Sequence, residues 1–546
     1  MGLFDPDRIP PELRFDIREF GTGVVPGVDC SQAIAAAIAA AVAVPDPALV
    51  YFPPGRWVVS PQMARTTSTT TITAQGHAIV VPAAGGVTLA GESRDVTAID
   101  FRAYGGGSHE SSWQTVAADG QVWRGGGIFL DGGTTAETAS APIVIRDLEL
   151  NGGTSYTGNN THPANPATGD GWDLTHKGVW LRNTAYFQSV RIERCEIHGF
   201  RGELVYAGAN NRAQLQEVVG RDNLLHETNG DCWSVIGARV IFERNECHTA
   251  AAHGVEDNPF DKACTYADNL IHDTDLCGIW VYPGTLTGPF GRIDVSRNRI
   301  ERAGTDGIRL DNPQGAHVHD NLVIDPSTGS AQSGIHVGAR SGTNGPTSVR
   351  GVTVERNTVL ADTQDVYIGI RAYDEGGAPS SRIIVRDNHA GLTDAGAGAG
   401  RTLTRAFDLA GITDPKAFLG NNTSRGSTYA ASDSGSAREV LLTGTTEVEV
   451  VKRRPQQPGN WHVLVYFRVV TADTALTVTA RWYDASGAQQ SATMVTGTQT
   501  VGSHTVNPLV ASAVGDTESQ YVRLSAQAGT ANRVYMTAQL VEIPTL

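Results

Sequence analysis

The stretch Gly220-Arg221-Asp222-Asn223-Leu224-Leu225 holds a pattern that returns along the middle of the chain. It reads apolar, any residue, Arg or Asp, Asn, any residue, apolar. The Asn, replaced once by Cys, stands at Cys195, Asn223, Asn245, Asn269, Asn298, Asn321, Asn357 and Asn388. Successive positions are 22 to 36 residues apart. A short period with insertions of varied length is typical of a solenoid whose insertions form loops on one face.

Each repeat is predicted to consist of β-strands. Apolar and polar residues alternate on both sides of the Asn, as in Val352-Thr353-Val354-Glu355-Arg356-Asn357-Thr358-Val359, and helical spacing is absent. This alternation is the period of a strand with one buried face. An Asn at each turn can bond its own turn and its counterparts one unit away, at about 4.8 Å per unit. The repeat therefore predicts an all-β chain built on a parallel β-helix.

A second column lies between the Asn turns, where Gly precedes an apolar-any-apolar triplet, as in Gly278-Ile279-Trp280-Val281. If the apolar residues face inward, strand alternation turns one side chain per unit outward. The predicted outward row is Phe129, Trp180, Glu256, Trp280, Arg309, His336 and Arg371. Aromatic and charged residues in such a row indicate a ligand groove, and a solvated solenoid face is the alternative.

Composition bounds the partners of the protein. With 546 residues and 40% hydrophobic content, the chain can bury large cores in two or three domains. The net charge of −15 argues against nucleic acid and anionic membranes as partners, because no Lys/Arg cluster is available to neutralise phosphates. A local strip of Arg and His could still bind an anionic glycan.

The cysteines favour neither a metal site nor a redox motif. The six residues form no Cys-x-x-Cys pair: Cys30, Cys195, Cys232, Cys247, Cys264 and Cys277. We expect buried free thiols that pack as small apolar residues, in preference to disulfides. No metal site is predicted, and the cysteines leave the cellular compartment open.

The beginning of the chain shows neither a leader nor a membrane anchor. Residues Met1–Arg8 lack a positively charged start followed by an apolar run, so we expect no secretory signal, although the chain could have been trimmed. The longest apolar run, residues 33–44, is too short to span a bilayer and is better explained as a helix. No membrane insertion is therefore expected.

A family resemblance appears between residues 13 and 60. Three stretches look like the opening of the pectate-lyase-like superfamily of right-handed parallel β-helices: Phe15-Asp16-Ile17-Arg18-Glu19-Phe20-Gly21-Thr22-Gly23, Ser31-Gln32-Ala33-Ile34-Ala35-Ala36-Ala37-Ile38 and Leu49-Val50-Tyr51-Phe52-Pro53-Pro54-Gly55-Arg56-Trp57-Val58-Val59-Ser60. The resemblance implies a helix that caps the end of the solenoid, followed by the strand of the first rung. The family's second acidic turn is replaced here by Val24–Asp29. The resemblance covers residues 13–430 as a fold and does not indicate the reaction.

The capping helix also has a physical reason, because the end of a solenoid exposes an apolar cross-section. Ile34 and Ile38 share one face of the predicted helix, and Ser31 is the expected N-cap. We divide the chain into a cap with the first rung (residues 1–75), the parallel β-helix (76–430) and a C-terminal domain (431–546). Residues 151–176 form a long loop that is expected to wall the groove, and residues 421–437 are interpreted as a linker.

The last domain has a different pattern. Six or so alternating stretches between Gly, Asp, Ser and Asn turns predict an antiparallel β-sandwich for oligomerisation or carbohydrate binding. The stretches from Gly459 to Val470 and from Gly529 to Ala538 resemble the C-terminal sandwich modules of phage tail and similar surface proteins, which are often trimeric. A monomeric accessory or sugar-binding sandwich is the alternative.

Carboxylates concentrate near the outward row. The predicted catalytic residues are Asp231, His253, Glu256, Asp257, Asp306 and Asp311. Asp231, His253 and Asp306 each precede the column Gly or its equivalent, so we expect them to stack at one edge of one sheet. Side chains on adjacent rungs lie about 5 Å apart and on next-but-one rungs about 10 Å apart, which brackets the carboxylate separations of retaining and inverting glycosidases. A single Asp or Glu here could equally cap a turn.

The first hypothesis is a polysaccharide-cleaving glycoside hydrolase. Glu256 or Asp257 is the expected general acid, Asp231 or Asp311 the base or nucleophile, and Trp180 and Trp280 are sugar platforms. Further predicted substrate-binding residues are Trp233, Tyr282, Arg309, His336, Arg371 and Tyr373. Hydrolysis is favoured because carboxylates dominate the centre of the row, and it requires no cofactor.

Two alternatives stay open. A polysaccharide lyase acting by β-elimination on a uronate glycan needs a base such as His336, Arg309 or Lys177, with cations or Ca²⁺ offsetting the uronate charge. A non-catalytic tail protein or adhesin that binds a surface glycan would keep the aromatic residues and tolerate loss of the carboxylates.

Location and assembly follow from these hypotheses. A glycan-cleaving solenoid without a secretory signal fits a phage tailspike or minor tail protein of the virion, and a trimmed extracellular bacterial enzyme is the alternative. A homotrimer is expected, because the last domain carries more large residues than one small core can bury: Trp461, Tyr466, Phe467, Trp482, Tyr521 and Tyr535.

Overall fold

A computed structural model gives the fold. It describes residues 9–60, 63–66, 77–82, 86–101, 122–136, 141–153, 176–208, 214–259, 262–282, 292–326, 332–339, 349–373, 381–411, 418–420, 422–425, 427–429, 438–442, 448–453, 459–469, 474–483, 489–495, 498–499, 502–513, 522–528 and 534–543. The chain divides into two compact units, Met1–Asp294 and Val295–Leu546.

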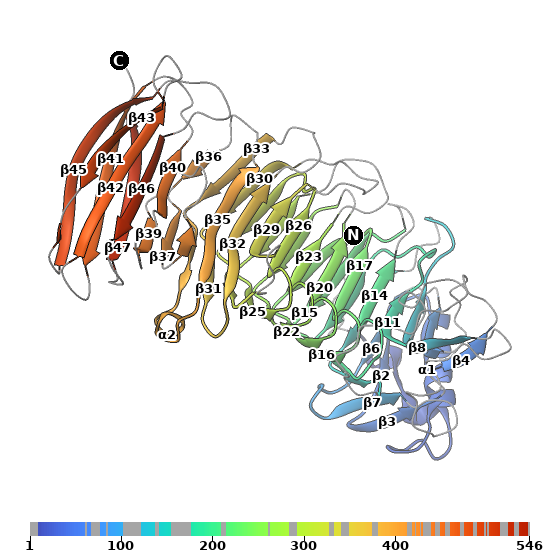
Figure 1. Cartoon of the computed structure of the whole chain (residues 1–546). Coiled ribbons are helices and arrows are strands. Elements are labelled where there is room, and N and C mark those ends of the chain that lie inside the picture. Colours follow the sequence, from blue (N-terminus) through green and yellow to red (C-terminus); the bar gives the residue numbers. More distant parts are fainter. Residues whose placement is uncertain are drawn as a thin grey trace. The chain divides into compact units, whose positions relative to one another are not determined.

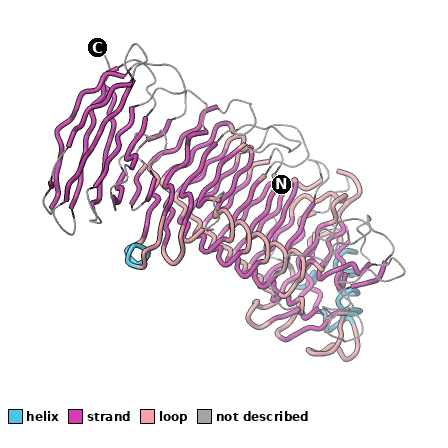
Figure 2. Tube along the Cα trace, viewed as in Figure 1, coloured by secondary structure: helices cyan, strands magenta, loops and turns pink. Residues whose placement is uncertain are grey.

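The first unit is a parallel β-helix with three strands per rung (Figures 1 and 2). Its first sheet contains β1 (Arg14–Asp16), β2 (Ala48–Tyr51), β6 (Val87–Ala90), β9 (Ile143–Arg146), β12 (Val190–Glu193), β15 (Glu217–Arg221), β18 (Arg239–Glu243) and β21 (Cys264–Ala267). Its second sheet contains β3 (Gly55–Val59), β7 (Thr97–Phe101), β10 (Glu149–Asn151), β13 (Glu196–His198), β16 (Leu224–Thr228), β19 (Glu246–Ala250) and β22 (Leu270–Thr274). Its third sheet contains β5 (His77–Pro82), β8 (Val122–Asp131), β11 (Lys177–Leu181), β14 (Val205–Gly208), β17 (Trp233–Ile236), β20 (Val255–Asn258) and β23 (Ile279–Val281).

The second unit repeats this three-strand rung. Its first sheet contains β27 (Ala316–His319), β30 (Arg350–Glu355), β33 (Ser381–Arg386) and β36 (Phe418–Gly420). Its second sheet contains β25 (Arg299–Ala303), β28 (Leu322–Ile324), β31 (Thr358–Ala361), β34 (His389–Leu392) and β37 (Thr423–Arg425). Its third sheet contains β26 (Ile308–Asp311), β29 (Ser333–Gly338), β32 (Val366–Tyr373), β35 (Leu403–Gly411) and β38 (Ser427–Tyr429). Strand β24 (Ile293–Ser296) spans the division, and a short helix α2 (Asp394–Gly398) comes after β34.

The predicted Asn column is a buried hydrogen-bond ladder at the corner between the first and second sheets. The side-chain oxygen of Asn245 accepts two hydrogen bonds from Asn223, one from its backbone N–H at 3.0 Å and one from its side-chain amide at 2.9 Å. The amide of Asn245 in turn donates to the carbonyl of Gly220 and to the side chain of Asn269. Cys195 has no side-chain amide, so in the ladder it makes only the backbone hydrogen bond, from its N–H to the side-chain oxygen of Asn223. The ladder satisfies the polar groups of a buried corner, as the repeat predicted.

The Arg or Asp before each Asn explains the rest of the motif. These residues adopt left-handed backbone, with φ between 53° and 58°, at Asp147, Arg194, Asp222, Arg244, Asp268, Arg297, Asp320, Arg356 and Asp387. Asp and Arg alternate strictly along this corner, so that neighbouring rungs present opposite charges. Pairs such as Arg194–Asp147 at 2.6 Å and Arg244–Asp222 at 2.8 Å result. Exposed pairs of this kind contribute little free energy each, and like charges in register would repel.

The ladder also continues beyond the expected end of the repeat. Asn388 donates its N–H to the side chain of Asn422 at 3.1 Å, and β36, β37 and β38 form one more rung. The interpretation of residues 421–437 as a linker is therefore wrong for residues 422–425 and 427–429. Asn422 follows Asn388 by 34 residues, within the range of the repeat, but Asn421 takes the place of the Arg or Asp, so the motif was not recognised.

Helix α1 (Ser31–Ala43) lies at the N-terminal end and contacts β1, β2, β5 and β6. Its buried face carries Ile34 and Ile38 together with three alanines, as predicted. The expected N-cap is off by one residue: Cys30 holds the cap position without a side-chain bond to the helix, and Ser31 is the first helical residue. Asp29 accepts from the N–H of Ser31 at 2.9 Å and does the capping instead.

The C-terminal strands pair in antiparallel fashion, as the change of pattern predicted. One group contains β39 (Arg438–Leu442), β47 (Val534–Ile543), β41 (Gly459–Val469) and β45 (Gly502–Ala513), and the other β40 (Val448–Arg453), β46 (Val522–Ala528), β42 (Thr474–Tyr483) and β43 (Gln489–Val495), with β44 (Thr498–Gln499) beside β42. The packing of these sheets into a sandwich stays a prediction. The side chains of the six aromatic residues behind the trimer hypothesis lie outside those that are described.

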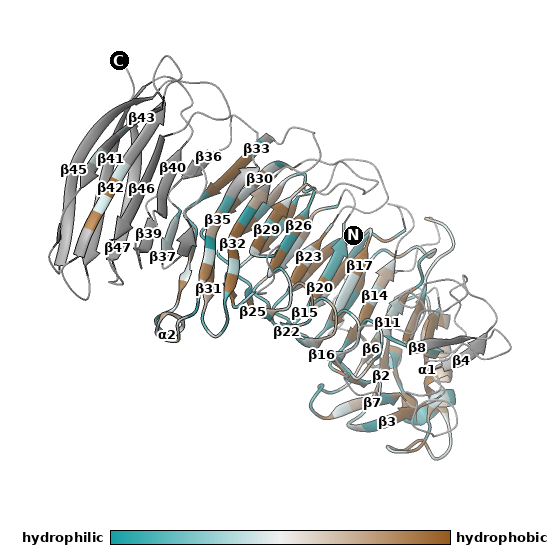
Figure 3. Ribbon diagram, viewed as in Figure 1, coloured by the Kyte–Doolittle hydropathy of each residue, from teal (hydrophilic) through white to brown (hydrophobic). Residues whose placement is uncertain are grey.

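The interior of the solenoid is apolar. Figure 3 shows hydrophobic and hydrophilic residues alternating along the strands of the third sheets. All six cysteines are buried and free, which confirms the prediction. In the described part of the chain, no helix is both long and apolar enough to cross a membrane.

Candidate functional site

The outward row exists and has the predicted register. On the third sheet of the first unit, Phe129 pairs with Trp180, Trp180 with Tyr206, Tyr206 with Ser234, Ser234 with Glu256 and Glu256 with Trp280. In the second unit, Arg309 pairs with His336 and His336 with Arg371. The expectation that the whole row is exposed is wrong, since Phe129, Trp180 and His336 are 0%, 2% and 2% exposed.

The aromatic start of this row forms its own cluster. Phe129, Trp180 and Tyr206 pack together, and the imidazole of His77 stacks on Phe129 at 4.6 Å between ring centroids. Burial lowers the pKa of His77 to about 3, so this imidazole is neutral. Trp180 is thus part of an aromatic core on the outer face and does not offer a free platform for a sugar.

A column of polar residues stands three positions before the outward row. It contains Lys177, Glu203, Asp231 and His253, on four successive rungs. Backbone bonds tie these rungs together: Leu204 N–H donates to Asp231 and Cys232 N–H donates to His253. The N–H of His253 also donates to Oδ1 of Asp231 at 2.8 Å. All four side chains are at most 7% exposed. The prediction that Asp231 and His253 stack at one edge of the sheet is correct in its geometry.

Asp231, His253 and Glu256 converge. One side-chain N or O atom from each lies within 4.8 Å of the others. Burial, and next the negative charge of Glu256, hold the pKa of Asp231 well above its usual range, with Glu203 adding to the effect. Two carboxyl groups this close cannot both be charged in a dry site, so Asp231 keeps its proton. The half-buried Glu256 is the member of the pair that reaches solvent.

His253 and two aromatic residues line the other side of Glu256. Nδ1 of His253 accepts from the N–H of Cys277 at 3.0 Å, which leaves the ring proton on Nε2. Trp280 lies 4.9 Å from the His253 ring and stacks on Tyr282 at 4.6 Å. Burial and then the charge of Glu256 raise the pKa of Tyr282 above its usual range, so the phenol keeps its proton. Trp280 and Tyr282 are half-buried and can meet a ligand.

Lys177 and Glu203 complete the column. They form a buried ion pair, with side-chain exposures of 0% and 5%. The ammonium group lies 3.7 Å from the centre of the Tyr206 ring, so a cation–π contact adds to the pairing. Burial of an ion pair costs free energy, and such pairs persist where their charge serves a site.

Two predicted site residues face the interior. Asp257 is fully buried and accepts from the N–H of Val235 at 2.6 Å, and burial raises its pKa well above the usual range. Trp233 is fully buried against Phe242. Strand alternation decides both positions, because Asp257 and Trp233 are each one residue away from an outward residue. Neither side chain can touch a substrate on the outer face.

The predicted residues of the second unit form a separate charged group. Arg309 pairs with Asp311 at 3.0 Å and with Asp306 at 3.4 Å, and Asp306 also accepts from the N–H of Ser333 at 2.6 Å. His336 lies 3.5 Å from Asp306. Arg371 is 3.5 Å from Asp408. The Tyr373 side chain lies outside the described ones. Each carboxylate here faces an Arg, unlike those of the first unit.

Reasoning from the sequence missed Glu203 and Tyr206. Leu204 takes the place of the column Gly in this rung, so the rung escaped the pattern. A usable indication was present, because Glu203 stands two residues before Val205 as Asp231 stands two before Trp233. The long loop expected to wall the groove falls mostly on residues 154–175, which are not among those described.

Comparisons with known proteins agree with this architecture. Residues 177–359 match the family model described as right handed beta helix region, which confirms the predicted right-handed parallel β-helix. No curated protein matches the sequence.

Several solved structures are similar to the chain. The A-module of the mannuronan C-5 epimerase AlgE4 from Azotobacter vinelandii is 18% identical, with 73% of this chain and 98% of that chain covered and a TM-score of 0.47. The tailspike protein of E. coli bacteriophage HK620 is 12% identical, with 94% of each chain covered and a TM-score of 0.47. The catalytic domain of a GH87 alpha-1,3-glucanase is 12% identical, with 78% and 66% covered and a TM-score of 0.43.

Proposed function

We propose that the protein is a glycan-cleaving enzyme whose reacting groups are Asp231 and Glu256. The observation that carries the proposal is the close approach of two carboxyl groups on adjacent rungs, the buried Asp231, whose pKa is raised by burial and by Glu256, and the half-buried Glu256. A pair of carboxyl groups held in opposite protonation states is what hydrolysis of a glycosidic bond requires.

In the hydrolytic reaction, Asp231 acts as the general acid and gives its proton to the glycosidic oxygen as the bond to the anomeric carbon breaks. Glu256, charged, stabilises the positive charge on that carbon and forms the covalent bond to it. Water then takes the place of Glu256, with Asp231 now accepting the proton of that water. A close pair favours this retaining course, because an inverting pair needs about 6.5 to 9.5 Å to hold a water molecule between carboxyl and sugar.

The surroundings support these roles. The N–H of His253 fixes one oxygen of Asp231 at 2.8 Å and leaves the other to carry the proton. The Trp280 indole, half-buried next to Glu256, offers an apolar face of the kind on which sugar rings stack. Trp180, which is buried, is not needed for this role.

A second candidate reaction is β-elimination on a uronate glycan. It is favoured by His253 and Tyr282 standing near Glu256, with a neutral Asp231 able to donate a hydrogen bond to a uronate carboxylate. In this reaction the charged Glu256 would remove the proton beside that carboxylate, and Tyr282, which keeps its own proton, would protonate the leaving oxygen. Ca²⁺ prefers six to eight oxygen ligands, and a protonated carboxyl with an imidazole fits it poorly. We therefore assign this reaction to protein groups alone.

Incubation with a panel of capsular and cell-wall glycans tests the proposal. New reducing ends without ultraviolet absorbance indicate hydrolysis, and reducing ends with the absorbance of an unsaturated product indicate elimination. Binding without either product, unchanged in an Asp231→Asn/Glu256→Gln double variant, would leave a glycan-binding adhesin and overturn the enzymatic proposal.

The tailspike-like role, the virion or extracellular location and the homotrimer stay part of the proposal. Light scattering on the whole chain tests the assembly, and a monomeric mass would contradict the homotrimer. Detection of the protein in purified virions would support the location, and detection only in medium from uninfected cells would contradict it.

A further inference from the structure

Four imidazoles form a stacked column on the second sheet of the first unit. His198, His226, His248 and His272 pair in register on β13, β16, β19 and β22. Their ring centroids are 4.8, 5.0 and 4.8 Å apart, and the planes differ by 3°, 13° and 10°. Each His stands three residues after the Asn slot of its rung, so the corner ladder brings these rings together.

Glutamates accompany every second His. Glu196 and Glu246 stand two residues before His198 and His248, on the same face of their strands. Leu224 takes this position on β16, and Leu270 takes it on β22. Each Glu bonds the His of the next rung, Glu196 to His226 at 3.0 Å and Glu246 to His272 at 3.4 Å, and lies near the His of its own rung. Two groups result, Glu196/His198/His226 and Glu246/His248/His272, each with its N and O atoms within 4.8 Å of one another.

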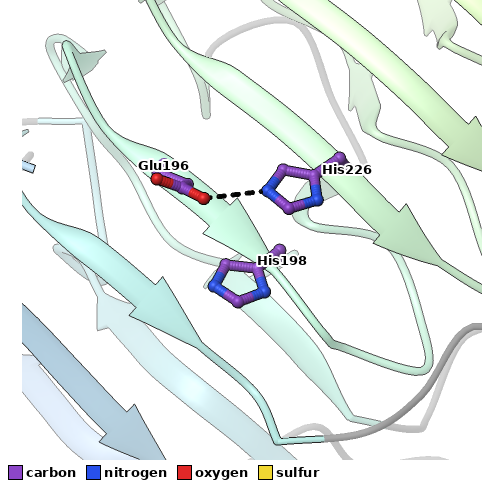
Figure 4. A group of neighbouring side chains, drawn as sticks. All are labelled: Glu196, His198 and His226. Carbon is purple, nitrogen blue, oxygen red and sulfur yellow. Dashed lines mark hydrogen bonds and ion pairs between the residues drawn. The ribbon is translucent and has the colours of Figure 1, made fainter. Parts of the chain in front are cut away.

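Figure 4 shows the first group, with the Glu196 carboxylate directed at His226 and the His198 ring beside it. Nε2 of His226 lies 3.0 Å from Oε1 of Glu196, whereas Nε2 of His198 lies 3.2 Å from Glu149, one rung away. His198 is thus drawn toward a different carboxylate, and it lowers the pKa of Glu149 to about 2. One imidazole of this group therefore already has a carboxylate partner outside the group.

The second group differs at the residue after its first His, which is Thr249 in place of Gly199. The carboxylate after its second His is also closer, because Glu227 lies 4.0 Å from Nδ1 of His226. Thr249 and Asp273 adopt left-handed backbone, with φ of 54°, which turns their side chains back toward the preceding ring. Nδ1 of His248 lies 2.9 Å from the Thr249 hydroxyl, and Nδ1 of His272 lies 2.7 Å from Oδ2 of Asp273. Nε2 of His272 points at Glu246, 3.4 Å from Oε1. The position after His198 is Gly199, which has no side chain to offer.

We propose that Glu246, His248 and His272 bind a divalent transition-metal ion of the Zn²⁺ class. Two imidazoles and one carboxylate, with water in the fourth place, are a known ligand set for Zn²⁺. Two ligands of a tetrahedral ion lie about 3.4 Å apart at bond lengths of about 2.1 Å, which is the separation of the His272 nitrogen and the Glu246 oxygen. The imidazole–carboxylate bond to Asp273 is the support that metal-binding His residues usually have.

The exposure of the ligands is also suitable. The Glu246 side chain is 46% exposed and that of His272 is 20% exposed, so an ion can enter from solvent. The rings of His248 and His272 must tilt toward each other from their near-parallel stack, and the ion then joins β19 to β22.

Titration calorimetry with ZnCl₂ on the full chain, dialysed against a chelator, tests the proposal. We expect one site that weakens at least tenfold in His248→Gln and in His272→Gln, and about 10- to 100-fold in Asp273→Asn. His198→Gln is the matched control and should bind as the native protein does. Affinity should fall as the pH drops below about 6, because protons compete for the imidazoles.

Two outcomes would overturn the proposal. One is a native protein that takes up no Zn²⁺. The other is binding that survives in both His248→Gln and His272→Gln but is lost in Glu256→Gln, which would assign the ion to the Asp231 group. Thermal melts of every variant confirm folding, and ZnCl₂ should raise the melting temperature of the native protein but not of His272→Gln. Glycan cleavage is measured in parallel, so that failure of either proposal is visible by itself.

Discussion

Asp231 in the first unit and Asp306 in the second hold the same place in their rungs and differ in the outward side chains beside them: Ser234 and Glu256 in the first, Arg309 and His336 in the second. Each accepts the backbone N–H of the next rung, from His253 at 2.8 Å and from Ser333 at 2.6 Å. The nearby outward residue is a second acid, Glu256, for the first carboxyl and the cation Arg309 for the second. The backbone bond is therefore structural in both units. The neighbouring side chains differ in charge: an acid beside Asp231 raises its pKa, whereas Asp306 forms an ion pair with Arg309.

The largest expected effect comes from removing the second acid. Glu256→Gln takes away the charged partner of Asp231, and we expect glycan cleavage to fall at least about 10³-fold. Glu246→Gln, on the second sheet, is the control and should leave cleavage unchanged. Rates of reducing-end formation measure the difference. A Glu256→Gln variant with more than a tenth of native activity would remove Glu256 from the reaction.

The corner that both units share should respond equally in both. Asn245→Ala and Asn321→Ala each remove four side-chain hydrogen bonds of the same geometry. They leave buried backbone and amide groups without partners, at a cost of about 3 kcal/mol of unfolding free energy. Denaturant melts measure both losses. A difference of more than about 1 kcal/mol between the variants would mean that the corners are not equivalent.

Sequence reasoning reached the fold because the Asn ladder is a local rule that repeats. Each Asn bonds only the rungs next to it, so the distance in sequence between two successive Asn residues is the length of one rung. A recurring distance of 22 residues or more therefore predicts the solenoid directly. The outward row was also correct in register, since strand alternation is local. Exposure was not local: Trp180 and His336 are buried by neighbours that spacing does not reveal.

The site itself was predictable only in part. Asp231, His253 and Glu256 were found because they fall at fixed distances from the column Gly or its equivalent. Their electrostatics depend on three rungs at once, and Asp306 had the same signature in the sequence. The sequence also shows the His column, as a His three residues after each corner in Asn269-Leu270-Ile271-His272. This column lies on the second sheet, whereas the predicted groove lies on the third.

Removing the cation of the second unit should make it resemble the first. Arg309→Gln leaves the buried Asp306 and Asp311 without their positive partner, and we expect a loss of about 2 kcal/mol at pH 7. Denaturant melts at pH 7 measure it, with Arg309→Lys as the control that keeps a positive charge. A loss of the same size in Arg309→Lys would point to lost packing of the Arg309 side chain instead.

The smallest expected effect has the opposite sign. The pKa of Asp231 is raised in the folded protein, so folding it ionised is unfavourable. Its contribution to stability is fully present below the unfolded pKa, near about 3.9, and is lost as the pH rises toward the folded pKa. The Asp231→Asn variant has no carboxyl to ionise, so its stability does not fall in this pH range. Its side-chain oxygen can still accept the hydrogen bond from the N–H of His253. We expect the variant to be more stable than the native protein at pH 7, by on the order of 1 kcal/mol, with the gain vanishing near about pH 3.5.

Asp306→Asn is the matched test of the same idea in the second unit. There the carboxylate pairs with Arg309, so its removal leaves a cation without one of its partners and should destabilise the protein at pH 7. Equal responses of Asp231→Asn and Asp306→Asn would mean that Glu256 does not control the protonation of Asp231. Opposite signs at pH 7 would tie the difference between the two carboxyls to the charges beside them, an acid next to Asp231 and a cation next to Asp306.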